Sequence, residues 1–232
     1  WDIWIDLQGD GPGLAAAANS PLIPIPEPAQ AIATGVWGQI LPAGTPETAE
    51  YDEWAQRLFE AYLRSIEKQR DYGVMNWGDW FGERGRNWGN NEYDLPHSLF
   101  LQFARTGNRD YFRLALAGAR HQADVDCVHG YPDPYVIGAN HAHSVCHTGE
   151  GSEMLRQPKW TRRYDKSTSA ENGHTWTEGM VDAWYLSGDP RPMEAAIGIA
   201  EHITWQMAPS FDQLGTHERS AGWSLQAILG IY

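Results

Sequence analysis

The feature of the chain that most constrains its fold is a repeated pair of helices joined by a tight turn. Gly107 and Gly188 each stand between two helical stretches, and in both copies a histidine, His121 or His202, follows the glycine by 14 residues (107 to 121 and 188 to 202). Helical hairpins that repeat along a chain must stack on one another to bury their apolar faces. The turns inside the hairpins are short and the loops between them are long. We therefore predict an all-α fold in which the hairpins form a closed ring, with the long loops over one mouth.

Apolar residues at helical spacing predict six helices. The first is expected over residues 47–71, with Thr45 as its N-cap and Pro46 in its first turn. The others are expected over residues 96–103, 109–123, 174–186 and 191–207, and from about residue 220 onward. Residues 1–46 are rich in proline and glycine and are expected to form an irregular segment beside the helical domain of residues 47–232.

Length and composition narrow the class of protein. The 232 residues suffice for one large core or for part of a larger domain, and the 42% hydrophobic content is that of a globular chain. No apolar run has the length that a bilayer requires, and no signal peptide is visible. The net charge of -13 argues against a nucleic-acid partner. The chain begins at Trp1 and ends at Tyr232 within patterned segments, so we expect it to be an excerpt from a longer protein.

Aromatic residues are frequent and several stand in polar loop sequence. The chain has 12 Trp and 10 Tyr, and a loop tryptophan indicates a surface on which flat rings stack against sugar faces. The two cysteines, Cys127 and Cys146, leave a disulfide open, because spacing alone cannot show one.

Three stretches hold side chains suited to acid, base and sugar-binding roles. Residues 76–94 combine tryptophans with amides, carboxylates and the cations Arg84 and Arg86. Residues 140–147 hold three histidines, and neutral histidine suits proton transfer near neutral pH. His174 and Glu178 are four residues apart at a helix start, and Asp182 continues the same face.

The sequence from 88 to 94, the helix from His97 to Phe103 with its turn, and the segments 143–149 and 173–179 resemble the catalytic domain of exo-rhamnogalacturonan lyases. Those enzymes belong to the six-hairpin (α/α) toroid group, and the resemblance covers roughly residues 73–232. It implies a secreted or periplasmic polysaccharide lyase that acts on pectic, uronic-acid-containing chains, with flanking β-rich domains outside the excerpt. The fold expected here is thus a partial toroid with long loops. No cofactor is expected, and whether calcium binds stays open.

β-Elimination at a 4-linked uronate requires a group that neutralises the carboxylate, a base for the C5 proton and an acid for the leaving oxygen. The residues expected to serve these roles are His143, His147, His174, Glu178 and Arg84. The residues expected to bind the sugar are Trp77, Asp79, Trp80, Trp88, Asn90, Asn91, Glu92, Tyr93, His97 and His141. Asp94 is expected to cap the helix that begins near Pro96. His97 is expected either to cap that helix or to reach the cleft, and the repeated His121 and His202 are expected to be structural.

Three other interpretations stay open. A glycoside hydrolase of the same fold, such as a glucuronidase, would use two carboxylates from among Asp79, Glu92 and Glu178. A non-catalytic scaffold would bind sugar through its tryptophans alone. A zinc site would use His141, His143, Cys146 and His147, although their spacing matches no established zinc motif.

Overall fold

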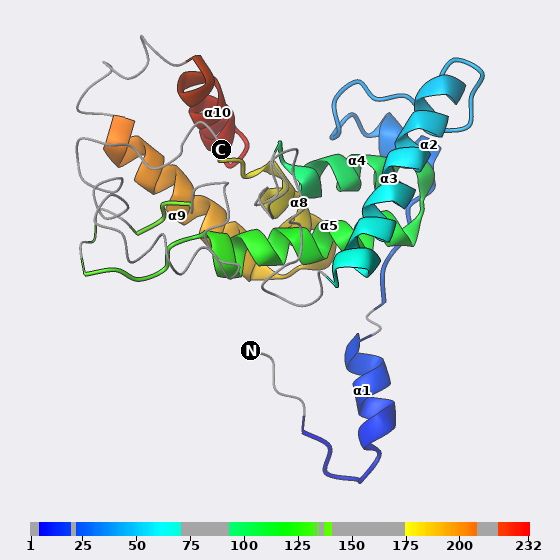
Figure 1. Cartoon of the computed structure of the whole chain (residues 1–232), viewed down its shortest axis with the longest axis horizontal. Helices are drawn as coiled ribbons and strands as arrows, with labels where there is room; N and C mark the ends of the chain where they lie inside the picture. Colours follow the sequence, from blue (N-terminus) through cyan, green and yellow to red (C-terminus); the bar gives the residue numbers. More distant parts are fainter. Residues whose placement is uncertain are drawn as a thin grey trace.

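The computed structural model describes residues 5–19, 22–70, 93–132, 134, 137–140, 175–207 and 218–232. Within these ranges the regular elements are helices, and the one extended pairing is an isolated bridge between Cys127 and Asn140. Figure 1 shows their arrangement. The elements are α1 (Gly11–Asn19), α2 (Pro28–Ala33), α3 (Ala49–Gln69), α4 (Leu95–Thr106), α5 (Arg109–His121), the π-helical turn η1 (Gln122–Asp126), α8 (Glu178–Ser187), α9 (Pro190–Met207) and α10 (Glu218–Leu229).

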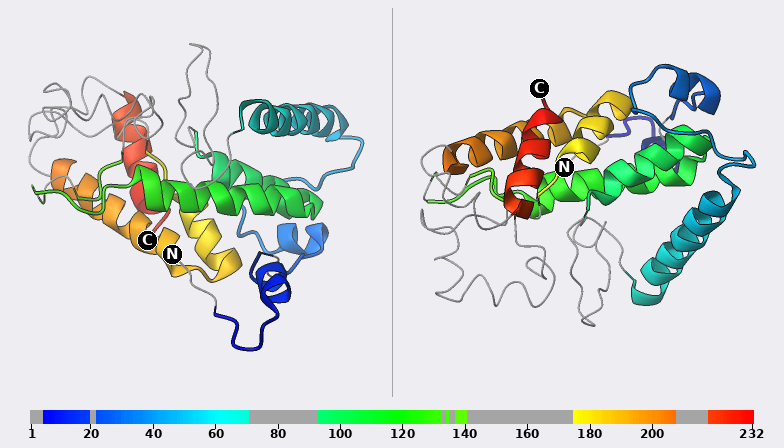
Figure 2. Two further views of the ribbon diagram at one scale, coloured as in Figure 1. Left: turned by 60° about the horizontal axis from the view of Figure 1, so that its bottom comes forward. Right: turned by 90° about the horizontal axis from the view of Figure 1, so that it is seen from above.

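The two predicted hairpins are present and are built in the same way. Gly107 ends α4 with φ 70°, and Gly188 ends α8 with φ 74°, a left-handed conformation that glycine adopts without strain. In each turn the glycine N–H donates to a carbonyl four residues earlier, at 2.7 Å and 2.8 Å. Asn108 then caps α5 and Asp189 caps α9 through their side chains. The hairpins α4–α5 and α8–α9 lie side by side (Figure 2).

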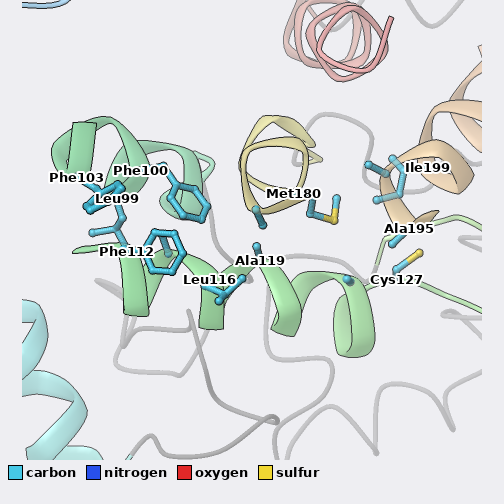
Figure 3. Packing of buried hydrophobic residues seen from close by; sticks show 14 of the residues in the cluster. Leu99, Phe100, Phe103, Phe112, Leu116, Ala119, Cys127, Met180, Ala195 and Ile199 are labelled. Carbon is cyan, nitrogen blue, oxygen red and sulfur yellow. The ribbon is translucent and has the colours of Figure 1, made fainter. Parts of the chain in front are cut away.

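The core lies where these two hairpins meet. Phe100, Phe103 and Phe112 pack edge to face between α4 and α5, with ring centroids 5.2 Å to 5.7 Å apart. Toward α8 and α9 the buried side chains become small, and alanines at 115, 119, 183 and 196 let the helices approach closely. Met180 fills the space between α8 and α5 and is fully buried (Figure 3).

Arg105 ties the N-terminal part of the chain to the hairpins. Its guanidinium donates to the Leu41 carbonyl at 2.7 Å and to the Asp52 carboxylate of α3 at 2.7 Å, and its residue exposure is only 6%. Phe59 of α3 adds a ring contact to Tyr111 of α5, with centroids 4.1 Å apart. Between α3 and α4 lies a largely apolar cavity of about 840 Å³.

The helix bounds differ from the predictions at several ends. Helix α3 begins at Ala49 instead of Glu47, because residues 45–48 form a turn in which the Thr48 N–H donates to the Thr45 carbonyl. The expectation that residues 1–46 are irregular is wrong in part, because α1 and α2 lie within them. The alanine run of α1 has high helix propensity, and Pro28 occupies a first-turn position where proline is tolerated.

Candidate active site

Helices α4 and α8 begin side by side, and one carboxylate caps both. Asp94, at the N-terminus of α4, accepts from the His97 N–H at 3.1 Å and from the Gly179 N–H of α8 at 3.1 Å and 3.2 Å. The predicted capping role of Asp94 is therefore confirmed, and it extends to a second helix. This close approach requires glycine at 179, because a Cβ there would lie 2.5 Å from an Asp94 oxygen and 2.6 Å from the Pro96 Cβ.

The His97 side chain lies between two carboxylates that α8 presents one turn apart. Its Nδ1 is 2.7 Å from Asp182 Oδ2, and its Nε2 is 3.8 Å from Glu178 Oε2. The side chains of His97, Glu178 and Asp182 retain 28%, 30% and 18% exposure, so the group is only partly covered. We call His97, Asp94, Glu178 and Asp182 the His97 cluster.

The three carboxylates keep His97 protonated. Burial lowers the pKa of His97, but the hydrogen bond and charge of Asp182, together with the charges of Asp94 and Glu178, outweigh burial and raise it to about 9. Burial also raises the pKa of Asp94 to about 6 and the pKa of Asp182 above its ordinary value, in the second case against the opposing bond from His97. At neutral pH the cluster thus holds an imidazolium whose orientation Asp182 fixes.

An aromatic cluster adjoins these groups. Trp176 is buried, and its ring centroid lies 5.7 Å from those of both Tyr93 and Trp223. Tyr93 and Trp223 lie edge to face with centroids 6.5 Å apart, and Tyr93 is 61% exposed. We call these three residues the ring cluster. It presents rings from α10 and from the starts of α4 and α8 at one place.

Glu178 also faces helix α10. The Gln226 amide donates to Glu178 Oε2 at 2.9 Å, and a hollow of about 340 Å³ lies beside the carboxylate. Leu225, Leu229 and two glycines complete its lining. The larger cavity beneath α3 includes no member of either cluster, so size alone does not mark the site.

The structure brings three of the predicted site residues together. Glu178, Tyr93 and His97 all lie at the shared start of α4 and α8. His97 does not cap α4 with its side chain, since Asp94 does so, and its ring reaches Asp182 instead. The other predicted site residues lie outside the described residues, and their roles stay predictions: Trp77, Asp79, Trp80, Arg84, Trp88, Asn90, Asn91, Glu92, His141, His143, His147 and His174.

Sequence reasoning missed the partner of His97. The sequence places Asp182 on the Glu178 face but does not indicate its contact with His97, and it does not distinguish Trp176, Trp223 or Gln226 as site residues. The repeat does indicate that His97 and Glu178 lie close together, because each stands ten residues before the turn glycine of its hairpin (97 to 107 and 178 to 188). Equivalent positions of adjacent hairpins lie at the same end of the helices, which predicts their proximity.

The histidines expected to be structural are buried. His121 is fully buried with its Nε2 3.4 Å from Asp126 Oδ1, and His202 is 4% exposed. Cys127 is a free, buried thiol, and burial together with the nearby Asp126 raises its pKa to about 12. It is therefore not a nucleophile at neutral pH.

Two further properties concern the described part of the chain only. It contains no group of three or more histidine, cysteine or acidic side chains arranged to hold a metal ion. None of its helices combines the length and apolar character needed to cross a membrane. The residues of the zinc hypothesis lie outside the described ranges.

Helical hairpins that carry an acid–base cluster beside a group of aromatic rings define a class of helical-hairpin domains with a polar site at one end. The chain belongs to the PcRGLX-like protein C-terminal alpha/alpha toroid domain family, whose model matches residues 21–164. It is also 32% identical over 136 residues to the uncharacterized protein YetA of Bacillus subtilis (strain 168). That match covers 53% of this chain and 15% of YetA, so the chain spans a small part of its relative's length. No solved structure matches the chain. The predicted (α/α) toroid fold is confirmed.

Proposed function

We propose that this domain acts on polysaccharide and that it is a lyase that cleaves uronic-acid-containing chains of the rhamnogalacturonan type by β-elimination. The observation that carries the proposal is the position of His97, which lies 2.7 Å from Asp182 and 3.8 Å from Glu178 beside the ring cluster. An acid–base group next to an exposed aromatic ring, here Tyr93, suits a site that cleaves sugar chains. The family, named for a PcRGLX-like protein, supports the carbohydrate role.

In β-elimination a base removes the C5 proton, the bond between C4 and its oxygen breaks, and a double bond forms between C4 and C5. The leaving oxygen must then receive a proton. His97 is suited to supply it, because its pKa of about 9 keeps the imidazole protonated at neutral pH. Asp182 orients the ring through Nδ1 and leaves Nε2 toward the Glu178 side of the site.

The His97 cluster cannot by itself hold the substrate carboxylate. It contains one imidazolium and three carboxylates, so its net charge is negative and it disfavours a second anion. A uronate therefore requires a cation from another part of the chain, and Arg84 stays our prediction for that role. The base likewise stays predicted among His143, His147 and His174.

A glycoside hydrolase is the second candidate, and one observation favours it. Glu178 faces both His97 and the hollow beside α10, so a carboxylate already borders space for a sugar. Hydrolysis would need a second carboxylate across the scissile bond, and of the earlier candidates Asp79 and Glu92 lie outside the described residues.

Product analysis separates the two reactions. The protein is incubated with pectic rhamnogalacturonan, and both ultraviolet absorbance and new reducing ends are followed. The lyase proposal predicts that both rise together and that His97→Gln reduces the rate at least tenfold, while His129→Gln does not. New reducing ends without a rise in absorbance would identify a hydrolase. If no uronate polymer gave either signal, both reactions would be contradicted.

Three accompanying predictions belong to this proposal. We propose that the protein is exported, that it carries β-rich domains beside the toroid, and that the reaction needs no cofactor. Dialysis against a chelator, followed by the same absorbance assay with and without calcium, tests the last of these.

A further inference from the structure

The residues directly before α8 are held by a glutamine that belongs to neither cluster. Gln122, the first residue of η1, is 2% exposed, and its Nε2 donates to the Trp176 carbonyl at 2.6 Å across 54 residues of sequence. Its own carbonyl accepts from the Cys127 N–H at 3.1 Å, the wide bond that makes this turn π-helical. Such turns are rare and occur frequently at functional sites.

The residue that Gln122 holds, Trp176, is the buried member of the ring cluster. Trp176 is 3% exposed, and its ring contacts both Tyr93 and Trp223. A displacement of the Trp176 backbone would move the ring on which the two other rings rest. The Gln122 bond therefore determines where the ring cluster lies relative to α5.

The same bond holds the start of α8. Glu178 follows Trp176 by two residues, and between them Thr177 is fixed on the other side, because its hydroxyl donates to the Ala227 carbonyl of α10 at 2.7 Å. This short stretch is thus held from η1 on one side and from α10 on the other. Glu178 begins α8 directly after it and meets His97.

We propose that Gln122 is a positioning residue of the site, which fixes the ring cluster and Glu178 against His97 through the Trp176 carbonyl. It does not touch the substrate. This inference rests on the proposed carbohydrate role for its effect on sugar binding, but its effect on the rings and on His97 does not depend on that role.

The test compares the whole chain with two substitutions of equal size. Gln122→Met keeps the length of the side chain and removes the donor. The control Gln102→Met removes a glutamine amide of α4 that bonds to Tyr51 of α3 and to Arg105. We measure near-ultraviolet circular dichroism of the tryptophans, the pKa of His97 by NMR, and the Kd for rhamnogalacturonan oligosaccharides. Gln122→Met is expected to change the tryptophan spectrum, to lower the pKa of His97 and to weaken binding at least tenfold, whereas Gln102→Met changes none of these.

Gln122→Glu keeps the test decisive if the methionine variant fails to fold. A glutamate can donate to the Trp176 carbonyl only when protonated, so the variant should match the wild-type tryptophan spectrum at acidic pH and depart from it as the carboxyl ionises. An unchanged spectrum, pKa and Kd in the folded Gln122 variants would overturn the inference. Wild-type protein that binds no oligosaccharide would contradict the proposed function alone, since the spectrum and the pKa would still test Gln122.

Discussion

His97 and Glu178 occupy equivalent positions in adjacent hairpins, and their side chains approach to 3.8 Å between Nε2 and Oε2. Each stands ten residues before the glycine that ends its helix (97 to 107 and 178 to 188). The repeat therefore builds the site: two hairpins of one design place a histidine and a carboxylate at the same end of neighbouring helices. Asp94 then fixes the two helix starts together.

The first prediction concerns Asp182. Replacing it with asparagine removes the charge bonded to His97 Nδ1, so the pKa of His97 should fall from about 9 by about one to two units. An NMR titration of the imidazole resonances measures this directly. Asp110→Asn, at an exposed position at the start of α5, serves as the control and should leave the value unchanged. A pKa that stays near 9 in Asp182→Asn would show that Asp182 is not the main partner.

The second prediction concerns stability against pH. The folded-state pKa of His97 is raised from 6.5 to about 9, so its stabilising contribution is complete below 6.5 and is lost as the pH rises through about 9. The free energy of unfolding should therefore fall by roughly 3 kcal/mol across that window, as measured by urea unfolding. Asp94 has a pKa of about 6, so its titration changes stability at lower pH, below the range in which His97 titrates. His97→Gln should largely abolish the slope, and an equal slope in that variant would refute the assignment.

The third prediction concerns the contact between the helix starts. Gly179→Ala places a Cβ 2.5 Å from Asp94 and 2.6 Å from the backbone nitrogen of His97, so the two starts must separate. We expect a loss of about 2–3 kcal/mol in unfolding free energy together with a lower pKa of His97. Gly198→Ala is the matched control, because no atom lies within 4 Å of its added Cβ, and in the interior of α9 it should stabilise by about 0.5–1 kcal/mol. Equal effects from the two substitutions would contradict the close approach.

The fourth prediction concerns Arg105. This buried guanidinium holds the Leu41 carbonyl and the Asp52 carboxylate. Removing it takes this donor from the Leu41 carbonyl and the cation from Asp52, to which Gly44 and Thr48 still donate. Arg105→Met should cost about 2–4 kcal/mol in unfolding free energy and should expose α3 to proteolysis. Arg109→Met, at an exposed position of α5, should change the free energy by less than about 0.5 kcal/mol. A small loss in Arg105→Met would mean that α3 is held mainly by its apolar contacts.

The hairpins were predictable from sequence because their signals are local. Gly107 and Gly188 mark turns that require a left-handed residue, and the flanking apolar periodicity defines the helices. The toroid class followed from the repetition of this unit. The π-helical turn was not predictable, because the sequence of residues 122–126 does not differ from that of a continued α-helix. Gln122 bonds to Trp176, 54 residues away, and this contact is not visible in the local sequence.

The site was predictable in its residue types but not in its pairings. Composition and position indicate Glu178, Tyr93 and His97, and all three lie at the shared helix start. The bond between His97 and Asp182 joins residues 85 apart, and only the packing of α4 on α8 creates it. The aromatic signal pointed to loop tryptophans, whereas Trp176 is a buried support whose position depends on η1 and α10.

An NMR titration of the protein with rhamnogalacturonan oligosaccharides tests whether the His97 cluster and the ring cluster form one sugar site. The ring signals of His97, Tyr93 and Trp223 are followed together, with His129 as an internal reference. If the two clusters form one site, the three signals will shift with one common Kd while the His129 signal stays unchanged. Saturable binding that leaves the His97 and Trp223 signals unchanged would show that the sugar binds elsewhere and that this site does not exist.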